Sequence, residues 1–214
     1  DEGGDASQHS GEFIETRGIV TAIGGYFYFI QDGEGDYSGV YVYNSPGDLA
    51  LGDDITIIGN VAEYNGLTQI SDVSTTTIHS SGNTLPAARV LTTGAVASEL
   101  NEGMLVKTAG PCTAVSAAPG SDRWLFQLDD GSGAAFADDG IFTPTTTVGT
   151  TYEITGALTY YYGNFSVLTR DAADVVEVIV EPEVDLTGRW TLAPIAGALM
   201  VGPNPNDGSW WSNS

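Results

Sequence analysis

The sequence has few basic residues. Its 214 residues include six Lys and Arg against 28 Asp and Glu, which gives a formal net charge of −22. The cations are spread along the chain and are Arg17, Arg89, Lys107, Arg123, Arg170 and Arg189. Surfaces that bind nucleic acid through its phosphates usually carry a basic stripe, because Lys and Arg displace counterions. No such stripe can be drawn here, so no nucleic acid is expected as a partner.

Cysteine and long apolar runs are also scarce. Cys112 is the single cysteine, so no disulfide can form within the chain, and its apolar neighbours predict a small buried side chain. No run of 18 apolar residues exists, so we expect no transmembrane segment. The opening DEGGDASQHSGE is polar and typical of a flexible tether at the start of a mature exported protein. Together with the low lysine content, these features predict an extracellular or cell-surface bacterial protein.

Enzyme motifs are missing as well. His9 and His79, the two histidines, lie in polar stretches without a neighbouring nucleophile motif. The sequence contains no phosphate-cradling glycine loop, no Cys/His metal spacing and no nucleophile elbow. We therefore expect no catalytic residue and no enzyme activity.

An internal repeat organises what is present. LGDDITIIGNVAEYNGLTQI (51–70) matches VGTTYEITGALTYYYGNFSV (148–167), and YFYFIQDGEG (26–35) matches WLFQLDDGSG (124–133). The chain therefore contains two copies of one unit, at about 11–80 and 101–180. A flexible segment at 1–10, a linker at 81–100 and a C-terminal extension at 181–214 complete the predicted organisation.

Each copy predicts five short strands, rich in Val, Ile, Thr and Tyr. We expect them at 14–23, 26–31, 39–43, 53–63 and 67–73, and again at 104–115, 123–128, 134–137, 150–160 and 165–169. Asn65-Gly66 and Gly163-Asn164 are hairpin signals between the last two strands of each copy. Five antiparallel strands with a long link after the third describe an OB-fold barrel. The predicted fold is all-β, with two tandem five-stranded OB-fold-like barrels and a short β-rich C-terminal extension.

Two stretches carry a resemblance to known families. RGIVTAIGGYFYFIQDGEGDYSGVYVYN with LGDDITIIGNVAEYNGLTQI, and then NEGMLVKTAG at 101–110, resembles the OB-fold modules of bacterial extracellular nucleases and related secreted proteins. This resemblance covers about 160 of the 214 residues. It implies that any hydrolytic site belongs to a separate downstream domain. LTGRWTLAPIAGALMVGP followed by WWS resembles the start of a secreted β-sandwich module of the Bacteroidetes.

Acidic residues in Gly-containing loops are the candidate metal ligands. They are Asp32, Glu34, Asp36, Asp129, Asp130, Asp138 and Asp139. Calcium takes six to eight oxygens, and alternating carboxylates in such a turn can supply several of them. Asp and Gly are equally suited to a solvated hairpin turn. Calcium is thus the one candidate cofactor, with a plain turn as the alternative.

Tyrosines on the second and third strands are the candidate ligand face. Alternation places Tyr26 and Tyr28 on one side of their strand and Phe27 and Phe29 on the other. If the phenylalanines fill the barrel, the outward residues are Tyr26, Tyr28, Tyr41 and Tyr43. OB-folds bind oligonucleotides and oligosaccharides on these strands. The alternative is that the aromatic residues stabilise the sheet or pack against the other barrel.

The tryptophan side chains of the extension must be buried against another part of the protein or another molecule, because a tail of this length cannot form a core by itself. Trp190, Trp210 and Trp211 can pack back on the barrels, dock on a neighbouring molecule as an added strand, or belong to a truncated module.

The whole pattern favours a non-catalytic extracellular or cell-surface structural protein. We expect it to self-assemble as a homo-oligomer or polymer, such as a filament, through β-strand and aromatic contacts. The alternative is an accessory polysaccharide- or nucleic-acid-binding module of a secreted enzyme.

Overall fold

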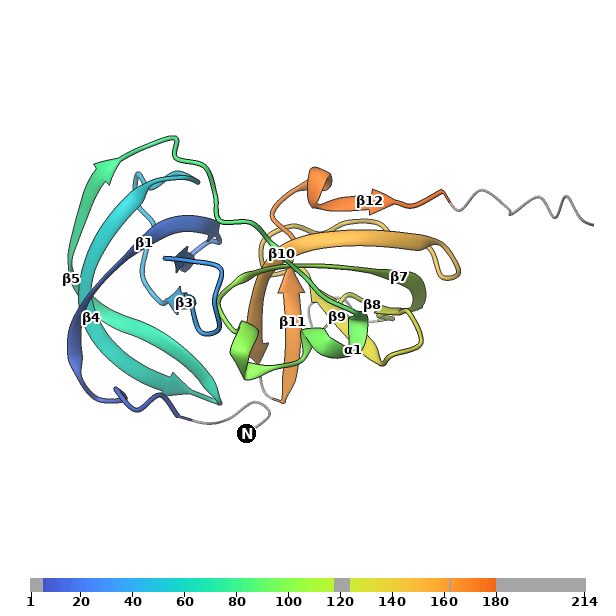
Figure 1. Ribbon diagram of the computed structural model, residues 1–214, viewed down its shortest axis with the longest axis horizontal. Helices are drawn as coiled ribbons and strands as arrows, with labels where there is room; N and C mark the ends of the chain where they lie inside the picture. The colour runs from blue at the N-terminus through green and yellow to red at the C-terminus, as the bar shows by residue number, and fades with distance from the viewer. Residues whose placement is uncertain (1–5, 118–123, 162, 180–214) are drawn as a thin grey trace, which may run out of the picture. The chain divides into compact units, whose positions relative to one another are not determined.

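The structure, a computed structural model, describes residues 6–117, 124–161 and 163–179. Within these ranges the chain is nearly all β, which confirms the predicted fold class (Figure 1). The helical elements among them are short: α1 at Thr93–Val96 and two 3-10 turns, η1 at Glu99–Asn101 and η2 at Ala172–Asp174. The predicted domain boundaries stay predictions.

The first copy forms a closed barrel. Its strands are β1 (Phe13–Ile23), β2 (Tyr28–Gln31), β3 (Gly39–Val42), β4 (Asp54–Tyr64) and β5 (Leu67–Ser80), joined in the order β1-β2-β3-β5-β4. All pairs are antiparallel except β3–β5, which is parallel. The expectation of five antiparallel strands is therefore wrong at this one pair. A closed ring with an odd number of strands cannot alternate direction throughout, so one parallel pair is unavoidable.

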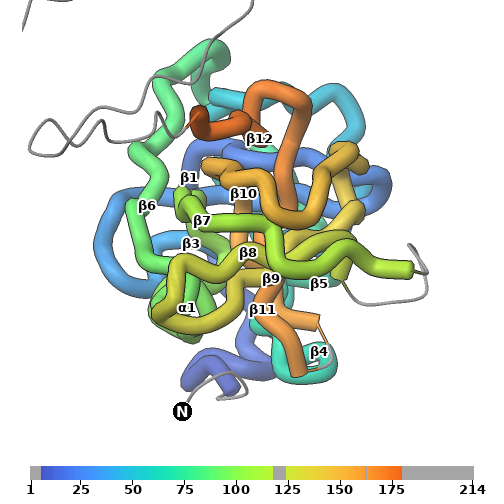
Figure 2. Tube along the Cα trace, turned by 90° about the vertical axis from the view of Figure 1, so that its right-hand side faces the viewer, coloured from blue at the N-terminus to red at the C-terminus, as the bar shows by residue number. Residues whose placement is uncertain are grey.

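The second copy repeats this ring. Its strands are β7 (Leu105–Val115), β8 (Phe126–Asp129), β9 (Ala134–Asp138), β10 (Thr151–Tyr161) and β11 (Asn164–Leu168). Pairing of β10 with β7 closes the ring, and β9–β11 is its parallel pair. Figure 2 shows β8, β9 and β11 side by side. Two short strands, β6 (Arg89–Val90) and β12 (Val175–Glu177), extend the sheet through β7 and β10 respectively.

Glycine and asparagine set the last hairpin of each barrel. Asn65 and Gly66 have φ of 53° and 89°, and Gly163 has φ of 98°. Tight hairpin turns need such positive φ values, which Asn and Gly adopt most readily. Strand β5 is longer than predicted because the register shifts between Ile58 and Asn60, opposite Asp72 at φ 49°. This bulge lets β5 continue to pair with β4 instead of ending at 73.

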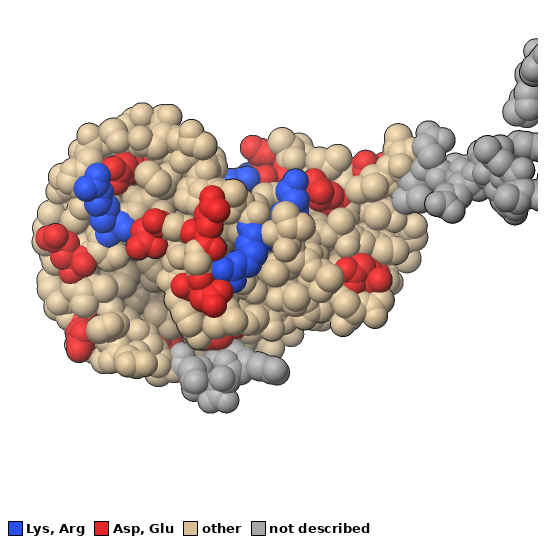
Figure 3. Space-filling view, viewed as in Figure 1, with Lys and Arg blue, Asp and Glu red and all other residues tan. Residues whose placement is uncertain are grey.

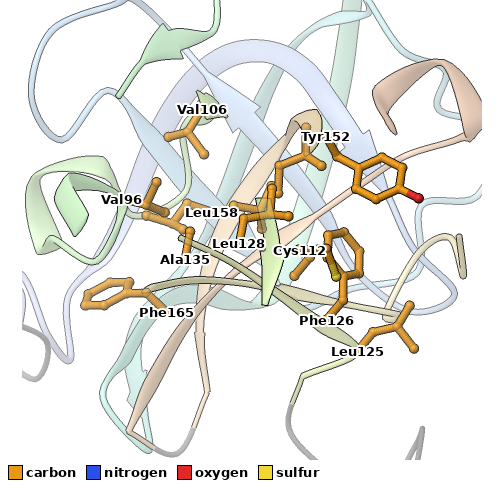
Figure 4. Close-up of a cluster of buried hydrophobic side chains, with 13 residues drawn as sticks. Val96, Val106, Cys112, Leu125, Phe126, Leu128, Ala135, Tyr152, Leu158 and Phe165 are labelled. Carbon is orange, nitrogen blue, oxygen red and sulfur yellow. The ribbon is translucent and has the colours of Figure 1, made fainter. Parts of the chain in front are cut away.

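Each barrel has its own apolar interior. The first contains Val20, Tyr28, Ile30, Val42, Ile55, Ile57, Val61 and Ile70. In the second, Figure 4 shows Leu128, Ala135 and Leu158 close together, with Cys112 beside Phe126. Cys112 is buried, as predicted.

A third apolar cluster lies between the barrels. Ala22 and Phe29 of the first barrel pack with Ala157 and Leu168 of the second, and all four are buried. The buried side chain of Gln31 crosses the same joint, where its Oε1 accepts a hydrogen bond of 2.9 Å from the backbone N–H of Leu105. The two copies are therefore joined by buried side chains as well as by the connecting segment.

The joint also contains a close backbone approach. A Cβ atom added to Gly39 would overlap the backbone of Gly103, and one added to Gly103 would overlap Gly39 and Val40. Only glycine at both positions lets the two barrels meet this closely.

Candidate nucleic-acid interface

The predicted outward row of tyrosines is wrong at Tyr28. This side chain is 0% exposed and lies inside the first barrel, opposite Val42. Phe29 points the other way, into the joint with the second barrel. Alternation correctly separates Tyr28 from Phe29, but both faces of β2 are buried, so apolar character could not identify the interior one.

The other three tyrosines lie around the edge of the joint. Tyr26 and Tyr43 are 55% and 52% exposed, and their rings meet edge to face with centroids 5.4 Å apart. Tyr41 is half-buried and stacks on Phe27, with 5.0 Å between centroids and 20° between planes. Its ring also meets Phe29 edge to face at 5.2 Å. Tyr41 and Tyr43 are therefore held by aromatic neighbours.

Phe27, Tyr41 and Tyr43 line a cavity of about 450 Å³, which we call the aromatic pocket. Both barrels contribute to its wall, which consists of Phe27, Tyr41, Tyr43, Tyr64, Leu67, Gln69, Asp138, Gly140, Thr159, Tyr161 and Leu168. Tyr64 ends β4 and Tyr161 ends β10, so the same position of the repeat reaches the pocket from each copy. Cavities of this size accommodate small planar ligands.

Among the described residues that line the pocket, Asp138 provides the one carboxylate. Its Oδ1 accepts a hydrogen bond of 2.6 Å from the backbone N–H of Asp139. Burial raises the pKa of Asp138 to about 6, and interaction with the Asp139 carboxyl raises it as well. Burial also raises the pKa of Tyr41, next to Tyr43 and Tyr161. The pocket is thus aromatic and weakly polar, with one ionisable acceptor.

The second barrel has an aromatic pair that the sequence analysis missed. Trp124 and Phe136 lie with ring centroids 5.9 Å apart on the outer side of β8 and β9. Gln127 pairs with Phe136 as Phe29 pairs with Tyr41 in the first barrel. Gln127 and Phe136 are half-buried, whereas Phe29 is fully buried. Alignment of WLFQLDD with YFYFIQD places Trp124 and Gln127 opposite Tyr26 and Phe29, whereas Phe136 lies beyond the aligned stretch.

The acidic loops have partners within the protein. Glu34 accepts a hydrogen bond from the backbone N–H of Ala87, and Asp36 pairs with Arg89 at 2.8 Å. Hydrogen bonds to Asp129 come from the backbone N–H groups of the following turn. Asp130 accepts bonds from Ser132 and Thr93, which lower its pKa.

No metal site is evident at these loops. No group of three or more His, Cys, Asp or Glu side chains suited to a metal ion occurs within 6–117, 124–161 and 163–179. Asp32 lies at a different cavity, at the mouth of the first barrel. Calcium binding by these loops and by Asp138 and Asp139 stays a prediction.

Basic side chains do not gather on the face shown in Figure 3, where the Lys and Arg groups lie next to Asp and Glu. Several cations of the chain form ion pairs, including Arg17 with Asp54 and Lys107 with Glu153. The predicted assembly residues Trp190, Trp210 and Trp211 lie outside the described residues. In the part of the chain that is described, no helix is both long and apolar enough to cross a membrane.

Comparison with known proteins gives a sequence relative and several structural neighbours. No family model matches the chain. It is 30% identical to the endonuclease YhcR of Bacillus subtilis (strain 168) over an alignment of 184 residues, which covers 77% of this chain and 15% of that protein. The tetrameric p202 HIN2 aligns at a TM-score of 0.38 and 11% identity, over 83% of this chain and 100% of that one. A murine DNA-binding protein bound to double-stranded DNA aligns at a TM-score of 0.36 and 12% identity, over 80% of this chain and 99% of that one.

These findings contradict the expectation that nucleic acid is excluded as a partner. The relative is an endonuclease, an enzyme that acts on nucleic acid. The expectation is wrong because net charge averages over the whole surface, whereas stacking on aromatic side chains is local. The predicted resemblance to bacterial nucleases is confirmed as far as the relative is a bacterial endonuclease. The filament prediction gains no support, and the extracellular location stays a prediction.

Proposed function

We propose that this chain is a non-catalytic module that binds single-stranded nucleic acid for a nuclease. The observation that carries the proposal is the aromatic pocket, where Phe27, Tyr41, Tyr43, Tyr64 and Tyr161 converge from both barrels. Stacking of a base on such side chains contributes about 1–3 kcal/mol and tolerates any sequence, because every base has a π-face.

A single strand suits this site better than a duplex. The pocket volume of about 450 Å³ lies within the range of small-molecule sites and has room for a single base, not for a duplex. A base inside a duplex would first have to leave its stack, which costs a few kcal/mol. An unpaired base can enter directly.

The relative supports an accessory role. Because the chain spans only 15% of the endonuclease that it resembles, its counterpart there is one part of a larger enzyme. A module that holds the strand would raise the local concentration of substrate at a catalytic domain. An exported location, as the sequence analysis predicts, belongs to the same proposal.

The charge of the chain predicts an unusual salt response. Proteins that neutralise phosphates bind more weakly as salt rises. With a net charge of −22, repulsion between protein and strand is screened as salt rises. We therefore expect affinity to stay constant or to increase between 50 and 300 mM salt.

The test is fluorescence anisotropy with labelled single-stranded octamers and the matching duplex. We expect the single strand to bind more tightly, and Tyr43→Ala and Tyr161→Ala each to weaken binding by about 1–3 kcal/mol. Tyr37→Asn is the matched control, because Tyr37 is exposed, lies outside the aromatic pocket and has a φ of 60° that Asn tolerates. Equal binding by all four proteins, or none by the wild type, would refute the proposal.

A further inference from the structure

Asp138 gives the aromatic pocket a chemical preference that aromatic side chains alone cannot provide. Stacking is nearly indifferent to base identity, whereas a carboxylate accepts hydrogen bonds and donates none when ionised. Asp138 is half-buried in the pocket wall, and the other lining side chains are aromatic, aliphatic, hydroxyl or amide groups. Within the described lining, a ligand that fills the pocket therefore meets a single anionic acceptor.

The carboxylate has acceptor positions to spare. Two carboxylate oxygens offer about four lone-pair directions. Contacts within the protein come from the backbone N–H of Asp139, at 2.6 Å from Oδ1, from the backbone of Gly140 and from the carboxyl group of Asp139. An ionised Asp139 carboxylate donates no hydrogen bond, so two acceptor positions of Asp138 remain for a ligand.

Among the nucleobases, guanine presents two adjacent N–H donors on one edge, N1–H and the 2-amino group. A carboxylate receives two such parallel bonds well. Adenine and cytosine each offer one amino group beside an acceptor nitrogen, which would face the carboxylate with a lone pair. We propose that the aromatic pocket holds a single unpaired guanine, with its faces against the tyrosines and its N1–H and 2-amino donors on Asp138.

This inference rests on the proposed function, because it assigns the base that enters the same pocket. Guanine recognition also goes beyond the proposed function, because a non-selective strand-binding module would not distinguish guanine from the other bases. A buried acceptor left without a donor also penalises every wrong base.

The preference should depend on pH. Asp138 must be ionised to accept both bonds, and its pKa of about 6 places the transition near that pH. Discrimination should be full at pH 8 and decline as the pH falls through 6 to 5. The titratable groups around Asp138 are Asp139 and the pocket residues Tyr41, Tyr43, Tyr64 and Tyr161.

The experiment measures binding of oligo-dT octamers that carry one central dG, dI, dA or dT. Inosine lacks only the 2-amino group, so it isolates one of the two bonds. A good bidentate pair gives about fivefold to a hundredfold discrimination. We expect dG to bind about tenfold or more tightly than dA or dT, with dI in between. Asp138→Asn should remove this preference, so that the dG octamer binds about as tightly as the dA and dT octamers.

Asp48→Asn is the control, because it removes one exposed carboxylate that lies outside the aromatic pocket. It should keep the dG preference. If Asp138→Asn fails to fold, the ratio of the dG and dI affinities of the wild type at pH 8 decides the question, and a ratio of one would overturn the inference.

The outcomes separate the two proposals. Equal binding of all four octamers would overturn guanine recognition and leave strand binding standing. No binding of any octamer would overturn the proposed function, and guanine recognition in a strand with it. Free GMP and IMP form a second arm: discrimination between them without oligonucleotide binding would support the guanine site and reject the strand as its source.

Discussion

The two barrels have the same strand order, but they use the outer face of the second and third strands differently. In the first barrel, Phe29 on this face is fully buried against the second barrel. In the second barrel, Gln127 and Phe136 occupy the equivalent pair of positions and are half-buried. A repeat thus preserves the path of the backbone, while a few side chains decide whether a face becomes an interface.

Phe29→Ala is expected to have the largest effect on stability. Removing a buried phenylalanine leaves a cavity and costs about 3–5 kcal/mol of unfolding free energy. Gln127→Ala, at the equivalent position, should cost less than about 1 kcal/mol because no second barrel packs on it. Chemical denaturation measures both. Similar losses at the two positions would mean that the two faces are not as different as their burial indicates.

Glu102 is expected to make the free energy of unfolding depend on pH. Burial raises the pKa of Glu102 to about 8, with a further contribution from Glu99, although Oε1 accepts a bond from the backbone N–H of Thr68. The folded protein therefore binds this proton more tightly than the unfolded chain. The cost of the ionised form is absent below pH 4.5 and grows as the pH rises through 8.

Glu102→Gln should consequently stabilise the protein by about 2–4 kcal/mol at pH 9 and leave it nearly unchanged at pH 4. Denaturation curves at both pH values measure the difference. Glu12→Gln, at an exposed glutamate, is the control and should have little effect at either pH. Stabilisation that is the same at pH 4 and pH 9 would contradict the assigned cause.

The two barrels can also be compared at the backbone position of Gly39. Its partner across the strands is Gln31, and the equivalent pair in the second barrel is Asp129 with Ala134. Gly39→Ala would push a methyl group into Gly103 and should cost about 1–3 kcal/mol. Ala134→Gly should cost less than about 1 kcal/mol, chiefly through backbone entropy. Thermal unfolding of the two variants provides the measurement, and a harmless Gly39→Ala would show that the barrels can separate at this point.

The sequence predicts local features well because they depend on neighbouring residues. Asn65-Gly66 and Gly163-Asn164 identify the hairpins, since only a few residue types tolerate positive φ. Alternation also places Tyr28 and Phe29 on opposite faces of β2. It cannot decide which face is interior, because packing of one barrel on the other provides a second apolar environment.

The aromatic pocket could not be predicted for the same reason. Tyr64 and Tyr161 are visible in the sequence as equivalent residues of the repeat, but their convergence depends on how the barrels meet. Asp138 was included as a calcium ligand together with Asp139, and the structure places it among tyrosines. Its chemistry follows from those neighbours, which lie far away in the sequence.

The joint between the copies has a consequence for how such a chain could arise. A duplicated gene first yields two identical barrels, and neither of them alone can form a cavity whose wall requires both Tyr64 and Tyr161. Once Gly39 and Gly103 allow close contact, two copies of one ancestral hairpin tyrosine face the same space. Selection could then act on a site that had no counterpart in the ancestor.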